Sequence, residues 1–296
     1  MKIVLIDKKG ASLEADRGVL RIGDSRIPMH LTDFVILSTA VSVELKTLHH
    51  ITEEGIGILS VDSRNRMMLM RSAQCKNGEL KAAQYEAFAK RRLPIAKAFV
   101  ASKITKHIAH IATLQDGEFE KEKLRQLDQA QSLDTLLGIE GSFTKRYFEA
   151  YFSAMPKLWH KGTRTKQPPR DPLNALLSFC YMTMYYRIAS RLIASGFEPA
   201  IGYLHTPFRS HYALASDMME HFRADINAFV HQSILDGTVA LEDFGRKNGK
   251  VYLRYEGRKR LWRVFTDWMQ AQESILYNHI AEFKRMIDEK AAGATQ

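Results

Sequence analysis

The spacing of apolar residues changes once along this chain, and that change limits the folds available to it. From residue 2 to about 71 the apolar residues form short runs such as KIVLI, DFVIL, GIGIL and MMLM, separated by glycine and polar turns. Such runs, rich in β-branched side chains, are typical of strands. After Cys75 apolar residues recur at intervals of three and four, which predicts amphipathic helices. We therefore expect an α+β protein, with a β-rich domain over 1–75 and a helical domain over 76–296.

Local signals predict individual elements within these two regions. In SVELKTLHHITEEG at 42–55, Ser42 is a candidate N-cap, the apolar residues follow helical spacing, and Gly55 is the stop. A long helix is predicted over 171–196, where Asp-Pro begins it and glycine ends it. The segment GKVYLRYEGRK at 249–259 is an exception in the helical region and predicts a short β-hairpin.

The formal net charge of +10 belongs to the second region. Residues 1–75 carry 10 basic and 9 acidic side chains, whereas the remaining residues carry 33 and 24. This excess favours a polyanionic partner, nucleic acid before membrane. The chain has no run of about 18 apolar residues, so we expect a cytoplasmic protein without a membrane partner. The two cysteines lack metal-ligand spacing and are expected to be packing residues.

A basic segment, PKLWHKGTRTKQPPR, precedes the predicted long helix at 156–170. Its glycine and adjacent prolines exclude regular helix, so we expect a long loop. A solvated surface loop is one interpretation, but the run of same-sign charge favours contacts with phosphates. The basic residues of this loop are Lys157, Lys161, Arg164, Lys166 and Arg170.

Three places carry side chains suited to catalysis. Glu140 lies in apolar surroundings, so it is either buried with a partner, directed into a pocket, or a carboxylate stabilised at a helix N-terminus. His205 follows an apolar segment, where a lone histidine is more often a packing residue than a ligand. Asp217 and Glu220 are one helical turn apart and could reach the same ion. Alternatively, Asp217, His221 and Asp225, at i, i+4 and i+8, form a salt-bridged stripe on a solvated helix face. The spacing alone does not distinguish the shared ion from the solvated stripe.

Other types of site have no sequence support. The chain lacks a phosphate-binding loop ending in Gly-Lys-Ser/Thr, an HExxH motif, a GxSxG nucleophile elbow and a dinucleotide-binding fingerprint. An imidazole and carboxylates suit a hard or borderline divalent metal. Metal-dependent phosphodiester chemistry is the remaining hypothesis.

Several motifs occur together in an order that is specific in combination. They are GIEGS at 138–142, PPRDPLNALLSF at 168–179, GFEP at 196–199, GYLH at 202–205 and DMMEHFR at 217–223, with the basic Gly-x-Arg loop after the first. In these motifs the chain resembles CRISPR-associated protein one, the integrase of spacer acquisition. The resemblance implies a small N-terminal β-sandwich domain, which makes a homodimer, followed by a helical catalytic domain.

The resemblance also implies the roles of the site residues. Glu140, His205 and Glu220 would hold Mg²⁺ or Mn²⁺, with Asp217 as a nearby acid that takes part in the site. Two departures from the family pattern are visible. The segment at 103–107 reads KITKH where the family often has Lys-Ile-x-Asn-Gln, and position 220 is Glu rather than Asp, a longer side chain that should still ligate.

The implied reaction is transesterification, in which a DNA 3′-hydroxyl attacks a phosphodiester at the edge of a repeat array; water as nucleophile gives endonuclease activity. The implied partners are protospacer DNA, the CRISPR repeat and CRISPR-associated protein two. The alternatives are a non-catalytic basic DNA-binding scaffold and a general metal-dependent nuclease. The candidates for phosphate contacts, of which the last two are closest in sequence to the predicted ligands, are Lys157, Lys161, Arg164, Lys166, Arg170, Arg209 and Arg223.

Overall fold

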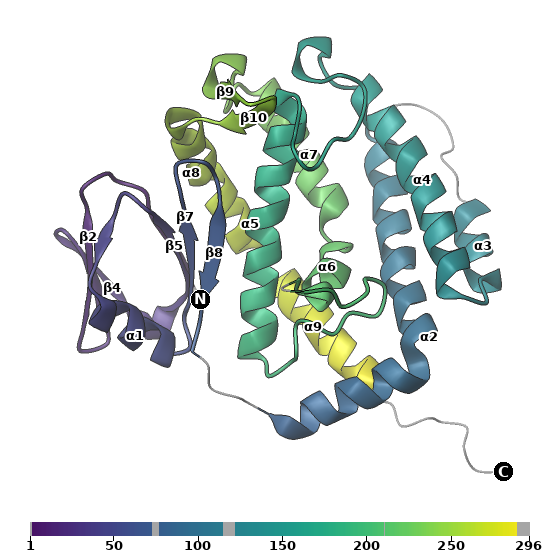
Figure 1. The fold of residues 1–296 in the computed structure, drawn as a ribbon, viewed down its shortest axis with the longest axis horizontal. Helices are drawn as coiled ribbons and strands as arrows, with labels where there is room; N and C mark the ends of the chain where they lie inside the picture. The colour runs from purple at the N-terminus through teal and green to yellow at the C-terminus, as the bar shows by residue number, and fades with distance from the viewer. Residues whose placement is uncertain (1, 73–76, 115–121, 210, 289–296) are drawn as a thin grey trace.

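The computed structural model describes residues 2–72, 77–114, 122–209 and 211–288, and the predicted boundary after Cys75 lies outside them. The strands of the N-terminal part, with one short helix, are followed by a mainly helical part (Figure 1). The α+β class predicted from the change in periodicity is confirmed. Within the described ranges no helix is long and apolar enough to cross a membrane.

The first sheet contains the strands predicted from KIVLI, DFVIL, GIGIL and MMLM. In spatial order its strands are β1 (Lys2–Ile6), β5 (Thr32–Ser38), β7 (Gly57–Val61) and β8 (Met67–Met70). The first three are parallel, and β8 pairs antiparallel with β7. Every residue of β5 is buried. This burial requires cover on both faces of the sheet and explains the uninterrupted apolar run of this strand.

A second sheet covers one face of the first. In spatial order its strands are β4 (Ser25–Pro28), β3 (Val19–Ile22), β2 (Ser12–Asp16) and β6 (Ser42–Val43). Val35 and Leu37 of β5 share a buried cluster with Leu13 of β2. Phe34 and Ile36, at the alternate positions of β5, join the core of the helical part instead. The first sheet is therefore a middle layer between the second sheet and the helices.

The short helix α1 (Leu45–Glu53) begins later than predicted. Glu44 occupies its N-cap position. Ser42 lies in β6, where its N–H donates to the carbonyl of Ala11 at 2.9 Å, so strand pairing takes the residue that was expected to cap the helix. Gly55 follows the helix with φ of +78°, a left-handed conformation that favours glycine, and the predicted stop is confirmed.

The helical part surrounds one central helix. Its helices are α2 (Gly78–Ile111), α3 (Glu122–Gln129), α4 (Leu133–Ser153), α5 (Pro172–Ala194), α6 (Ala213–Met219), α7 (Arg223–Leu235), α8 (Tyr255–Ala271) and α9 (Glu273–Asp288). Short 3₁₀ turns cover Met29–Leu31, Lys157–Trp159 and Leu241–Asp243. The long helix α2 contains a kink at Arg91, whose φ of −133° and ψ of 24° are not helical. Pro94 lies three residues further on and cannot donate a helical hydrogen bond, which accounts for the break.

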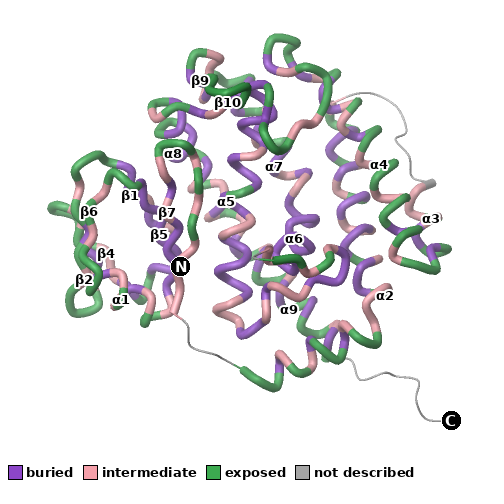
Figure 2. Tube along the Cα trace, in the orientation of Figure 1, coloured by how far each residue is buried: buried purple, intermediate pink, exposed green. Residues whose placement is uncertain are grey.

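The central helix α5 begins and ends at the predicted residues. It is buried along most of its length (Figure 2). At its start the N–H of Asn174 donates to Asp171 Oδ1 at 2.8 Å, and Pro172 is the first helical residue. At its end Gly196 has φ of +91°. A capping carboxylate and a terminal glycine are local signals, which is why both were visible in the sequence.

The predicted hairpin in the helical part exists but lies earlier in the chain than expected. It is formed by β9 (Phe244–Lys247) and β10 (Lys250–Leu253). The predicted range was 249–259, but α8 already begins at Tyr255. Asn248 and Gly249 make the two-residue turn, with φ of 51° and 71°. Asn-Gly at positive φ is the preferred turn of a tight hairpin, and this dipeptide marks the centre of the hairpin in the sequence.

A buried group of ion pairs joins the first sheet to the helices. Arg187 of α5 contacts the carboxylates of Asp33 on β5 and Glu273 on α9. Arg191, one turn further along α5, approaches Asp33 Oδ2 at 2.6 Å. We call these four residues the lock cluster. Since all four are buried, the cluster helps to fix the orientation of the sheet against α5 and α9.

Candidate active site

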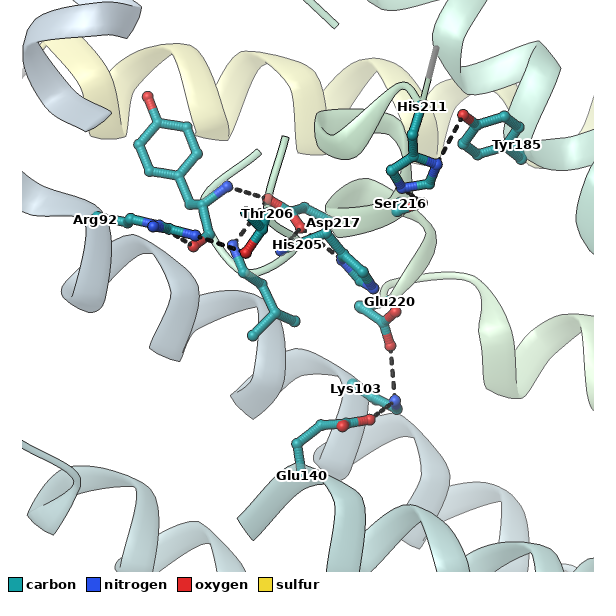
Figure 3. A network of polar contacts seen from close by, with 12 residues as sticks. Arg92, Lys103, Glu140, Tyr185, His205, Thr206, His211, Ser216, Asp217 and Glu220 are labelled. Carbon is teal, nitrogen blue, oxygen red and sulfur yellow. Dashed lines mark hydrogen bonds and ion pairs between the residues drawn. The ribbon is translucent and has the colours of Figure 1, made fainter. Parts of the chain in front are cut away.

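The four residues predicted to form the site converge in the helical part (Figure 3). Glu140 projects from α4, Asp217 from α6, and Glu220 directly follows α6. His205 lies in the loop that precedes α6. Figure 3 shows Glu140 and Glu220 pointing toward each other from opposite sides of a lysine on α2.

That lysine, Lys103, was noted in the sequence only as part of a departure from a family motif. Its ammonium lies 2.9 Å from Glu220 Oε2 and also donates to Glu140 Oε1. Glu140 Oε1 accepts a second hydrogen bond, of 2.8 Å, from Thr144 Oγ1. Only 4% of Lys103 is exposed. A signal was available, because Lys103 interrupts the buried stripe of α2 and a lysine at such a position requires a partner.

Glu220 interacts with two cations. Arg223 Nε donates to Glu220 Oε1 at 2.8 Å, while Lys103 faces Oε2. Burial alone would raise the pKa of Glu220, but the charges of Arg223 and Lys103 hold it well below its usual range. The approach of Lys103 to Oε2 is an ion pair that is not aligned as a hydrogen bond. We call Lys103, Glu140, Glu220 and Arg223 the carboxylate cluster.

Asp217 is fully buried and organises the segment that carries His205. Its Oδ1 accepts hydrogen bonds from the backbone N–H of His205 at 2.9 Å and from His205 Nδ1 at 2.8 Å. Its Oδ2 accepts from the backbone N–H groups of Leu204, at 3.1 Å, and Tyr203. In the neutral tautomer whose Nδ1 donates to Asp217, Nε2 is the ring nitrogen free to act as a ligand or proton acceptor.

The fold brings this segment close to α6 through Gly202. A Cβ at this position would lie 2.7 Å from the backbone of Ala213 and 2.8 Å from the carbonyl oxygen of His205. Only glycine allows this approach. The short Gly-Tyr-Leu-His segment is therefore needed to position the imidazole as well as to supply it.

The proposed stripe of Asp217, His221 and Asp225 does not form. The helix ends after α6 and restarts with α7, so the three residues do not share one helical face. His221 Nδ1 is 2.6 Å from Ser102 Oγ, and its ring stacks on His279 at 3.9 Å. Asp225 pairs with the side chain of Lys106 at 2.8 Å. His221 and Asp225 therefore each contact partners other than Asp217.

The donor set fits a divalent cation, although a different cation lies between the carboxylates. Among the residues that the structure describes, no three His, Cys, Asp or Glu side chains are arranged as a preformed metal site. Glu140 and Glu220 face one space, and His205 lies close enough to Glu220 that its ring, when protonated, lowers the pKa of that carboxyl. Two carboxylates and an imidazole held by Asp217 are suitable ligands for Mg²⁺ or Mn²⁺. The residues therefore fit the metal in chemistry, with Lys103 between the two carboxylates.

A cavity of about 650 Å³ adjoins the carboxylate cluster, because Arg223 belongs to both. Its walls come from the basic loop, α5, the segment before α6, the turn between β7 and β8, and β10. Both cations and aromatic rings line these walls, with Tyr181, Tyr185 and Phe208 among the rings. Such a combination suits a nucleic-acid strand, in which phosphates and stacked bases alternate.

The structure brings some of the predicted phosphate-contacting residues together and leaves others apart. Lys166, Arg164, Arg209 and Arg223 line the cavity, whereas Lys157, Lys161 and Arg170 do not and are exposed elsewhere on the loop. Arg64 and Lys250 also line the cavity and were not predicted. No sequence signal links these two to the site, because they approach it from distant turns.

Arg164 has a structural role in the basic loop. Its guanidinium donates to Asn174 Oδ1 at 2.9 Å, to Ser178 Oγ at 3.2 Å and to the carbonyl of Thr165. These bonds fasten the loop to the start of α5. The surrounding protein lowers the pKa of Arg164 through burial. Arg164 therefore shapes the cavity wall, and contact with a phosphate remains a prediction.

The comparison with protein families decides the assignment. The model of the family described as CRISPR associated protein Cas1 matches residues 4–267. This chain belongs to the Cas1 family. The motifs that suggested the resemblance lie within the matched range, and the predicted family is confirmed.

Curated members of the Cas1 family match most of the chain. CRISPR-associated endonuclease Cas1 1 of Thermodesulfovibrio yellowstonii is 27% identical over 315 aligned positions, which cover 98% of each chain. CRISPR-associated endonuclease Cas1 3 of Thermus thermophilus is 32% identical over 268 positions, which cover 88% of this chain and 80% of the relative.

Solved structures share the Cas1 fold at lower sequence identity. A Cas1 protein from Thermotoga maritima superposes with a TM-score of 0.88 at 16% identity and covers both chains completely. A casposase bound to integration product has a TM-score of 0.85 at 21% identity, with 98% of this chain and 92% of that chain covered. A Cas6-RT-Cas1–Cas2 complex gives a TM-score of 0.79 at 23% identity over 97% of this chain and 35% of that chain. At these identities the likeness shows the fold alone.

Proposed function

We propose that this Cas1-family protein is a divalent-metal-dependent DNA integrase and endonuclease that joins short DNA segments to a CRISPR repeat. The observation that carries the proposal is the convergence of Glu140, Glu220 and His205 beside a cavity lined by cations and aromatic rings. The curated relatives are named endonucleases, and one structural neighbour is a casposase with its integration product. The alternative of a non-catalytic DNA-binding scaffold does not explain why two carboxylates and an oriented imidazole face one space.

The proposed cofactor is Mg²⁺ or Mn²⁺, held by Glu140, His205 and Glu220. When bound, such an ion would polarise the target phosphate and stabilise the charge that develops during the reaction. Asp217 keeps the His205 ring oriented through the hydrogen bond at Nδ1. Arg223 lies between Glu220 and the cavity and is the cation best placed to meet a phosphate there.

The proposed reaction exchanges one phosphodiester bond for another. The oxygen of a DNA 3′-hydroxyl forms a new bond to the target phosphorus, the existing bond to the leaving 3′-oxygen breaks, and the leaving strand takes up a proton. With water as the nucleophile, the same groups give hydrolysis. Lys166, Arg209 and Lys250 would hold the phosphates, so DNA affinity should fall steeply with salt.

Two protein partners complete the proposal. A homodimer through the N-terminal β-rich region is one, and CRISPR-associated protein two is the other. One structural neighbour is a Cas6-RT-Cas1–Cas2 complex, which supports the second partner. Light scattering of the purified full-length chain over a range of concentrations tests the dimer.

The activity test mixes the protein with a labelled short duplex bearing free 3′-hydroxyls and a supercoiled plasmid that carries a repeat. A covalently joined product is expected with Mg²⁺ or Mn²⁺ and not with EDTA. The His205→Ala variant should lose joining but retain DNA binding. Metal-dependent cleavage without joined product would favour a general nuclease, and DNA binding without cleavage or joining would favour the scaffold.

A further inference from the structure

Lys103 occupies the space that two of the proposed metal ligands share. Its ammonium contacts Glu140 Oε1 and lies 2.9 Å from Glu220 Oε2, and the residue is buried (Figure 3). Its neighbours along the same stripe of α2, Val100 and Ile104, are completely buried. The backbone beneath the ammonium is therefore fixed, and only the side chain can change its position.

The charges of the carboxylate cluster balance without a metal. Two glutamates face two cations, Lys103 and Arg223, but the cations differ in position. Arg223 binds Glu220 Oε1 at 2.8 Å, whereas Lys103 bridges between the two glutamates. An ion placed between the two glutamates would compete with Lys103 for Glu220 Oε2 and would meet the positive charge of Lys103 at close range. Arg223 can keep its contact with Glu220 Oε1 in either case.

We propose that Lys103 is an internal competitor of the divalent cation: its ammonium neutralises the two glutamates in the metal-free protein and leaves the space between them when the cation binds. This inference rests on the metal dependence in the proposed function. Lys103 would lower the affinity for the metal and would raise the stability of the metal-free protein. Without a cation between them, the buried carboxylate of Glu220 and the partly buried carboxylate of Glu140 would repel each other.

The test measures Mn²⁺ binding to the full-length chain by calorimetry, together with thermal unfolding in the presence and absence of Mn²⁺. Lys103→Met keeps an unbranched side chain of similar length and removes the charge. It should bind Mn²⁺ about tenfold more tightly or better, because a close repulsion between charges is removed. Its metal-free melting temperature should fall, and saturating Mn²⁺ should raise that temperature by more than it does in the unmodified chain.

Lys106→Met is the matched control. Lys106 lies one turn along the same helix and pairs with Asp225 at 2.8 Å, outside the carboxylate cluster. Its replacement removes the same charge from the same helix and should leave the Mn²⁺ affinity unchanged. If both variants tighten binding equally, the effect comes from net charge and the inference is overturned.

Other outcomes separate this inference from the proposed function. Mn²⁺ binding to the unmodified chain that is equal or stronger than binding to Lys103→Met would overturn the competitor role and leave metal dependence standing. No binding to either protein would overturn both. If Lys103→Met does not fold without metal, Lys103→Gln replaces it, since the amide can still donate to one glutamate. That variant should also bind Mn²⁺ more tightly, and Lys103→Arg, which keeps the charge, should not.

Discussion

The carboxylate cluster and the lock cluster have the same balance of charges and different surroundings. Each joins two acidic and two basic side chains that are largely withdrawn from water. The lock cluster lies between β5, α5 and α9, and none of its residues lines the 650 Å³ cavity. The carboxylate cluster adjoins that cavity through Arg223 and has the oriented imidazole of His205 beside it.

This difference shows that buried ion pairs do not by themselves identify an active site. A buried pair is strongly destabilising to break, yet its formation offsets little more than the cost of desolvation, so a structural role is the usual one. The additional features of the carboxylate cluster are an available imidazole nitrogen and an adjoining space for a ligand. Mutations in the two clusters should therefore affect different measurements.

The largest expected effect is on strand joining by Glu220→Gln. Loss of one carboxylate charge should lower the joining rate on the order of 10³-fold, because the charge stabilisation supplied by a metal amounts to several kcal/mol. DNA affinity, measured by filter binding, should change only a few-fold. Joining at the unmodified rate would show that the carboxylate cluster is as structural as the lock cluster.

The lock cluster should respond in stability instead. Arg187→Met removes one of the two arginines that pair with both Asp33 and Glu273, so the free energy of unfolding should fall by about 3–5 kcal/mol. Denaturant unfolding measures this loss. Joining per folded molecule, assayed at low temperature, should stay near that of the unmodified chain. A folded variant that has lost its joining activity would contradict the separation of the two clusters.

Asp217→Asn tests whether the orientation of His205, beside the carboxylate cluster, matters for activity. The amide can replace one acceptor but not the charged partner of Nδ1, so Mn²⁺ affinity and joining should both fall about 10–100-fold. Asp225→Asn is a suitable control, because Asp225 pairs with Lys106 away from the cluster. Equal losses in the two variants would show that acidic charge in this region matters more than the orientation of the imidazole.

The smallest effect concerns acid stability. Because Arg223 and Lys103 depress the pKa of Glu220 despite burial, its stabilising contribution is present above the unfolded value of 4.5 and is lost as pH falls toward the folded value. Urea unfolding measures the free energy of unfolding at pH 6 and at pH 3.5. The decrease between these two pH values should be smaller in Glu220→Gln than in the unmodified chain by about 1 kcal/mol.

The lock cluster supplies the control for this pH dependence. Arg187 and Arg191 lower the pKa of Asp33 although burial opposes them, whereas burial raises the pKa of Glu273. Because the pKa of Glu273 is raised in the folded protein, protonation of Glu273 favours the folded state. Glu273→Gln should therefore not reduce the decrease in the free energy of unfolding between pH 6 and pH 3.5. A reduction as large as that of Glu220→Gln would contradict these assignments.

The sequence predicted those elements that depend on neighbouring residues. Asp171 and Gly196 bound α5 through a side-chain cap and a left-handed terminus, both of which are local. The alternation of apolar runs predicted the strands of the first sheet in the same way. Ser42 was assigned wrongly, because its pairing partner in β2 lies in a distant part of the sequence. The predicted range of the hairpin lies too late in the chain, because it does not place the Asn-Gly turn at 248–249 at its centre.

For the site, the sequence by itself determined the candidate side chains, Glu140, His205 and the acids at 217 and 220, and the family resemblance implied their role as metal ligands, which stays a prediction. Only the tertiary structure decided that Asp217 orients His205 and that Lys103 lies between Glu140 and Glu220. The physical reason is that the strength of a charge interaction depends on separation in space and on burial, and neither is set by distance along the chain.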